Sequence, residues 1–238
     1  MINIERSELY RRPEYTLENM GRVFVVLNKF GIVFSPQKQN EVDQLFCGID
    51  FADQLTDNQI FFPNAPEDIL SFLAGKRDSL PPEFPQPVVE NFTFLKGIVE
   101  RRGFDDQLEK TVGELLSLHK QLSSTCLIPE YIDLTKKEAV KSAEMAFLFL
   151  DEDLPLNVKE YLIQANILGN LADNLLDLES DHAEHQILIQ PSNRLKLALK
   201  MAITKQLAYL IRHYSQKREL KGLAKKYVAM LFQRNEGR

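Results

Sequence analysis

Two sets of aspartates recur at four-residue intervals, and both fall in stretches with helical periodicity. The first set is Asp53 and Asp57, and the second is Asp173, Asp177 and Asp181. Because four residues turn an α-helix by about 400°, the members of each set project from one face. Like charges at this spacing destabilise a helix by roughly 0.2–0.5 kcal/mol per pair. A bound Mg²⁺, which prefers carboxylate oxygens and often holds substrate phosphates as well, would reverse that cost.

The second set carries the stronger indication of a site, because the segment around it is otherwise mostly apolar. Its polar residues form a narrow stripe along one face of the predicted helix: Asn166, Asn170, Asp173, Asp177 and Asp181. Buried polar groups need partners, so we interpret this stripe as functional. For Asp53 and Asp57 a solvated helix face is the simpler interpretation.

A third acidic run, residues 105–109 with the sequence DDQLE, also resembles a metal-binding DDxxE motif. It follows Gly103 and opens a predicted helix. Aspartates are favoured there by the free amides of the first turn and by the helix dipole. We therefore interpret this run as a helix start.

The elements that position these residues are predicted to be helical throughout. Glycine is scarce, few segments alternate like strands, and the apolar residues recur with a helical period. Residues 60–90 hold more than half of the eleven prolines and are predicted to be largely loop around one short helix. We predict a single all-α domain over residues 1–238. The predicted helices are 16–31, 36–58, 66–75, 86–102, 105–124, 135–150, 155–181, 192–216 and 218–234.

Two local signals fix predicted helix ends. Thr135 and Glu138 have the spacing of a capping box, so a helix is expected to begin at Thr135. Gly31 is expected to end the first helix.

The residues around both aspartate sets resemble the squalene/phytoene synthase group of the isoprenoid synthase fold. Residues 46–57, FCGIDFADQLTD, are similar to the first motif of that group, F-C-R-x-x-D-D-x-x-D, with an insertion or shift. Residues 168–181 match the spacing of its second motif, Q-L-x-N-x-x-R-D-x-x-x-D. The separation of the two stretches suits the helices that the family places between its motifs.

The resemblance implies a fold, a cofactor and an activity. The fold would be a helical bundle with a central cavity, and three Mg²⁺ ions would hold a prenyl diphosphate. Loss of the diphosphate would give an allylic carbocation, which either condenses with a second chain or cyclises. The metal-binding and catalytic residues implied are Asp53, Asp57, Asp173, Asp177 and Asp181.

Substrate contacts are expected from a second set of residues. A diphosphate needs cations besides magnesium. The candidate cations are Lys136, Lys137, Lys141, Arg194, Lys200 and Arg212. An apolar cavity could be lined by Met145, Phe147, Leu148 and Phe149, although plain core packing is the alternative for each of them. The residues that we predict to bind substrate are Asp50, Lys141, Phe147, Asn170 and Arg212.

Some family residues are replaced, and this keeps two other function classes open. The second aspartate of the first motif is Gln54, and the arginine before Asp177 is Leu176. These changes motivate a second interpretation, a catalytically silent relative that acts as a binding or assembly factor. A third interpretation is an unrelated all-α interaction protein.

Composition and sequence pattern limit which partners and which cellular compartment are expected. The net charge of −5 argues against nucleic acid as the main partner. No signal peptide and no apolar run of transmembrane length is present, so a cytoplasmic protein is expected. Cys47 and Cys126 are expected to be buried thiols in a reducing compartment. The basic stretch at residues 217–226 leaves room for a peripheral membrane contact.

Overall fold

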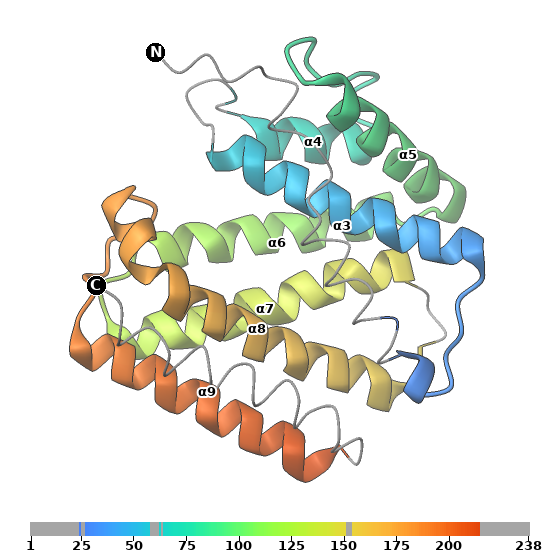
Figure 1. Ribbon diagram of the computed structural model, residues 1–238. Coiled ribbons are helices and arrows are strands. Elements are labelled where there is room, and N and C mark those ends of the chain that lie inside the picture. The colour runs from blue at the N-terminus through green and yellow to red at the C-terminus, as the bar shows by residue number, and fades with distance from the viewer. Residues whose placement is uncertain (1–23, 25–26, 58–61, 63, 151–153, 215–238) are drawn as a thin grey trace. The chain divides into compact units, whose positions relative to one another are not determined.

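The computed structural model describes residue 24, residues 27–57, residue 62, residues 64–150 and residues 154–214. All regular secondary structure in these residues is α-helical, which confirms the predicted fold class at that level. Most of the predicted helix 16–31 and all of 218–234 lie outside the described residues. No described helix is both long enough and apolar enough to cross a bilayer. The helices in Figure 1 are α3 Pro36–Asp57, α4 Ala65–Leu73, α5 Gln86–Arg102, α6 Asp105–Ser124, α7 Ile128–Leu150, α8 Leu156–Ala183 and α9 Asn193–His213.

Most helix ends lie where local chemistry predicts them. Gly31 adopts a φ of +78° after the helical residues 27–29, as expected for a helix stop. Gly103 ends α5 with a φ of +66°, and its N–H donates to the carbonyl oxygen of Val99. Asp105 lies in the first turn of α6, so the helix-start interpretation of residues 105–109 is confirmed. Ser192 caps α9, and its hydroxyl accepts a hydrogen bond from the N–H of Leu195.

The predicted start of α7 at Thr135 is wrong, because the helix begins earlier, at Ile128. Pro129 lies in the first turn, where its missing N–H costs nothing. Just before it, the Thr125 hydroxyl donates to the Glu130 carboxylate at 2.5 Å. Thr135 is instead fully buried inside the helix, with its hydroxyl donating to the Tyr131 carbonyl at 2.9 Å.

The prediction of two buried thiols is right for Cys47 and wrong for Cys126, which is exposed. Cys126 lies in the three-residue connection between α6 and α7. Its neighbour Thr125 takes the buried position there, so the thiol of Cys126 is left outside.

The chain divides into two compact units: Met1–Val112 with Met145–Leu154, and Gly113–Glu144 with Pro155–Arg238. The first unit is built around α3, α4 and α5, which lie together in Figure 1, with the last residues of α7. Its core joins Phe92 and Leu95 of α5 to Leu55 of α3 and to Phe149. The prediction of one domain over residues 1–238 stays a prediction.

Helices α3 and α5 approach closely at Gly48. A Cβ added there would lie 2.7 Å from Leu95 Cδ1 and 2.9 Å from Asn91 Oδ1. On the other side of Asn91, its amide group donates to the backbone carbonyl and to the side-chain Oε1 of Gln44, at 2.9 and 2.8 Å. Glycine therefore lets the two helices cross at a distance that a larger residue would prevent.

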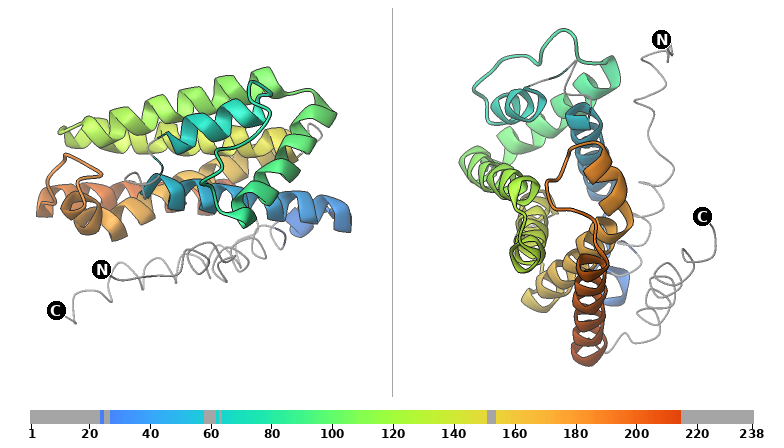
Figure 2. Two further views of the ribbon diagram at one scale, coloured as in Figure 1. Left: turned by 90° about the horizontal axis from the view of Figure 1, so that it is seen from above. Right: turned by 90° about the vertical axis from the view of Figure 1, so that its left-hand side faces the viewer.

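The second unit contains the antiparallel pair α8 and α9, which lie side by side in Figures 1 and 2. Tyr209 near the end of α9 donates to Glu160 near the start of α8, at 3.1 Å. At the other end of the pair, Lys196 forms an ion pair with Glu179. Between them the two helices bury an apolar face, contributed by Leu168, Leu171, Leu178, Leu195, Leu199, Ile203 and Leu210.

Candidate functional site

The acidic stripe of α8 lies on the side of the helix opposite its apolar face. The fully buried Leu168 and Leu171 mark the apolar face. At about 100° per residue, Asp173 and Asp177 point roughly the opposite way. Both aspartates are exposed, and no hydrogen bond or ion pair of their carboxylates occurs among the described residues.

Helix α7 runs antiparallel along the polar side of α8, within the second unit. The Asn166 amide donates to the Ala139 carbonyl at 2.7 Å, and the Asn174 amide donates to the Thr135 hydroxyl at 2.8 Å. Further along, the charge of Asp181 adds to burial in raising the pKa of the Tyr131 hydroxyl. The asparagines therefore hold α7 to α8, whereas the neighbouring Asp173 and Asp177 are left available for another partner.

The pKa of Asp173 is raised to about 6, first by the protein that surrounds it and then by the charge of Asp177 one turn away. The side chain nevertheless keeps access to solvent. A carboxyl group in this setting is costly to ionise, and a cation bound to both aspartates would lower that cost.

The residues of this stripe supply only part of the ligand set that a metal ion needs. Across the described part of the chain, no three His, Cys, Asp or Glu side chains gather closely enough to hold a metal ion by themselves. Mg²⁺ in phosphate-binding sites is commonly held by one or two carboxylates together with substrate phosphates. Asp173 and Asp177 could supply such a pair, so magnesium would bind well only with a diphosphate present.

The first aspartate set lies on α3, in the other unit. Gly48 and Leu55 mark the face of α3 that packs inward, and helical geometry places Asp50 and Asp53 on the opposite face. The Gln54 amide donates to Asp50 Oδ2 at 3.3 Å, which joins two residues of this face. The side chain of Asp57 lies outside the described residues. The central cavity that the resemblance implies, with metal ligands from both aspartate sets, stays a prediction.

The two cations predicted to bind substrate, Lys141 and Arg212, lie away from the α8 stripe. Lys141 is held at 2.6 Å by both Glu114 and Glu144, and these hydrogen bonds raise its pKa. Arg212 lies on the exposed side of α9, in the last turn, next to the first turns of α8. From Glu160 to Asp177, α8 extends about 25 Å. Neither cation is brought to the aspartates, although Asn170 belongs to the stripe and is half-buried.

The apolar residues that were expected to line a cavity divide between core and partly buried positions. Phe149 is buried in the first unit and packs edge-to-face on Phe104, with ring centroids 5.1 Å apart. Met145 and Leu148 pack against the same core, whereas Phe147 is half-buried. Core packing is therefore the better interpretation of Phe149.

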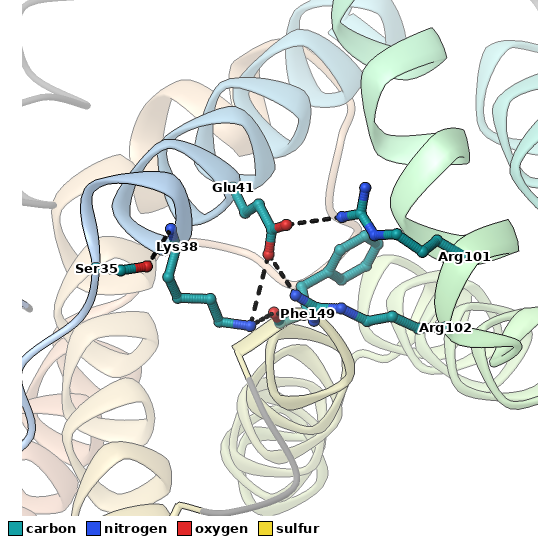
Figure 3. A network of polar contacts seen from close by, with 6 residues as sticks. All are labelled: Ser35, Lys38, Glu41, Arg101, Arg102 and Phe149. Carbon is teal, nitrogen blue, oxygen red and sulfur yellow. Dashed lines mark hydrogen bonds and ion pairs between the residues drawn. The ribbon is translucent and has the colours of Figure 1, made fainter.

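A second polar site, which the sequence did not indicate, joins α3, α5 and the end of α7 in the first unit (Figure 3). The buried carboxylate of Glu41 accepts hydrogen bonds from Arg101 at 2.7 Å and from Arg102. Lys38 and Arg102 also donate to the Phe149 carbonyl, each at 2.8 Å. A pocket of about 340 Å³ opens beside this network, lined by Val33, Phe34, Ser35, Gln37, Lys38, Glu41 and Arg102.

Each charged group of the network has a partner within it, although three cations share one carboxylate, and we interpret the network as structural. Its only sequence signal is a glutamate, Glu41, at a position where the helical period predicts burial. Its partners lie some sixty positions further along the chain, which a local pattern does not reveal.

Another pocket, of about 520 Å³, lies between α6 and α7 in the second unit. Its apolar part is formed by Leu118 and Val140, and lysines border it. The lining residues are Glu114, Ser117, Leu118, Gln121, Lys136, Lys137, Val140 and Lys141.

Comparison of the chain with models of protein families, with curated proteins and with solved structures found no match.

Proposed function

We propose that the protein is a Mg²⁺-dependent isoprenoid synthase that acts on a prenyl diphosphate. The observation that carries this proposal is the pair Asp173 and Asp177 on the polar side of α8. They are two exposed carboxylates one turn apart, and no described residue pairs with either. The raised pKa of Asp173 supports it, because such a group gains most from a bound cation. The spacing of the pair also fits the second motif of the squalene/phytoene synthase group.

The aspartates would bind magnesium together with the diphosphate, and the metal would neutralise the leaving group. The carbon–oxygen bond breaks, its electron pair stays on the diphosphate, and an allylic carbocation forms. The cation then loses a proton after condensation with a second prenyl chain or after cyclisation. An apolar surrounding would keep water from quenching it.

Product analysis tests this proposal. Geranyl, farnesyl and geranylgeranyl diphosphate are each incubated with the protein and Mg²⁺, and released pyrophosphate and hydrocarbon products are measured. Turnover is expected for the wild type and is expected to fall at least about a hundredfold in Asp177→Asn, since a metal ligand supplies several kcal/mol. Asp133→Asn serves as the matched control, because the one ion pair of Asp133 among the described residues is an exposed pair with Lys137. Equal turnover by Asp177→Asn and wild type would remove Asp177 from the site.

A second candidate is a binding or assembly factor with the same fold and no turnover. The positions of Lys141 and Arg212 favour it, because neither predicted cation lies at the stripe to neutralise a leaving diphosphate. Diphosphate binding in the presence of magnesium, without product from any of the three substrates, would support this candidate.

A further inference from the structure

Helix α9 differs in charge from the rest of the protein. The whole chain carries a net charge of −5, yet this 21-residue helix contains no Asp or Glu. Its cations are Arg194, Lys196, Lys200, Lys205 and Arg212. A basic helix in an acidic protein indicates a negatively charged partner for that helix.

The outward side of α9 combines four of these cations, all but Lys196, with exposed apolar groups. Leu195, Leu199 and Ile203 bury the inward side against α8. On the outward side, Leu197 is 60% exposed and Met201 is 52% exposed. We call this side the outer face of α9; it comprises Arg194, Leu197, Lys200, Met201, Thr204, Lys205, Ala208 and Arg212.

The cations of the outer face flank its apolar centre on both sides. With Leu197 as the reference, a helical wheel places Met201 and Ala208 within about 40° of it. Arg194, Lys205 and Arg212 then fall to one side and Lys200 to the other. Within the described residues, Arg194, Lys200, Lys205 and Arg212 make no ion pair. The outer face therefore presents uncompensated positive charge around exposed apolar side chains.

We propose that the outer face of α9 docks on an anionic lipid surface, with the helix lying parallel to the bilayer. Leu197 and Met201 would enter the boundary between headgroups and acyl chains, and the flanking cations would contact lipid phosphates. This is the pattern of interfacial helices, which have an apolar centre and a basic border. A nucleic acid would instead favour cations at the centre of the face, where the backbone phosphates lie. The proposal does not depend on the proposed enzymatic function.

Vesicle binding of the full chain tests the proposal. Sedimentation is measured with phosphatidylcholine vesicles, with and without about one third phosphatidylglycerol, at near-physiological salt. Binding is expected only with the anionic vesicles. Lys200→Gln combined with Lys205→Gln is expected to weaken it about thirtyfold, since each cation near such a surface contributes roughly 1 kcal/mol. Leu197→Ser combined with Met201→Ser is expected to weaken it as well.

The control variant combines Lys110→Gln with Lys120→Gln, which changes the net charge equally at exposed positions of α6. It should bind like the wild type. The proposal would be overturned by absence of binding to anionic vesicles, by equal weakening in the control, or by unchanged binding of both α9 variants. Tighter binding of the same face to duplex DNA than to anionic vesicles at equal salt would also overturn it, in favour of a nucleic-acid partner.

Discussion

At the scale of single residues, the pKa of Asp173, an aspartate of the α8 stripe, has a measurable effect on the stability of the fold. Its pKa of about 6 lies above the ordinary value of 3.8, so the folded protein binds this proton more readily than the unfolded chain does. Ionised Asp173 therefore destabilises the fold above about pH 6, and that cost disappears as the pH falls toward 4.

Replacing Asp173 with Asn should remove this cost. Without metal, Asp173→Asn is expected to be more stable than the wild type at about pH 7.5, with a smaller difference at about pH 5. Urea denaturation at the two pH values measures the effect. A variant that is less stable than the wild type at the higher pH would show that the carboxylate is stabilised by partners in the fold.

Gly48 gives a second prediction at this scale. Gly48→Ala is expected to destabilise the protein by about 1–3 kcal/mol, because the new methyl group would overlap Leu95 and Asn91. Gly97→Ala is the matched control: it lies inside α5, and nothing stands within 4 Å of its added Cβ. The control should gain up to about 1 kcal/mol from helix propensity. The urea midpoints of Gly48→Ala and Gly97→Ala are compared with that of the wild type. Equal shifts in the two variants would contradict the close crossing of α3 and α5.

At the scale of elements, Glu41 ties α3 to α5 beside the end of α7. It is only 4% exposed and accepts hydrogen bonds from Arg101 and Arg102, with Lys38 3.7 Å away. Glu41→Gln would leave three cations without their shared carboxylate. We expect a loss of roughly 3 kcal/mol in the free energy of unfolding, the lower end for a broken buried pair, because Arg101 is partly exposed.

The control for the Glu41→Gln variant is the exposed ion pair between Lys137 and Asp133 on α7. Lys137→Gln should cost less than about 1 kcal/mol, since exposed ion pairs contribute little. A similar small cost for Glu41→Gln would mean that solvent replaces the carboxylate and that the network does not hold these elements together.

At the scale of the whole molecule, local signals predicted the helices well where they lie close to the residues that they govern. Gly31, and the acidic run that follows Gly103, marked helix ends that depend on one turn of chain. The predicted start of α7 is wrong because the capping-box pattern pointed to Thr135, whereas the helix begins at Ile128 and the fold buries Thr135 against Asn174. Helix periodicity does not reveal such a long-range partner.

The sequence also predicted the local features of the candidate site, but not the contacts between its helices. Four-residue spacing was enough to place Asp173 and Asp177 on one face of α8. It did not reveal that Asn166 and Asn174 would be used to hold α7, or that Glu114 and Glu144 would occupy Lys141. Apart from the pair of Lys141 and Glu144, which lies within α7, these contacts join residues on different helices, so they depend on how the helices pack.

The central claim is a joint magnesium–diphosphate site at the α8 stripe, and thermal unfolding tests it most directly. The melting temperature is measured with Mg²⁺ alone, with pyrophosphate alone and with both, for the wild type, Asp177→Asn and Asp133→Asn. Ligand at one hundred times its Kd adds about 2.7 kcal/mol, so a rise of several degrees is expected. That rise is expected only with both ligands, in the wild type and Asp133→Asn but not in Asp177→Asn. An equal rise in Asp177→Asn, or no rise in any protein, would contradict it.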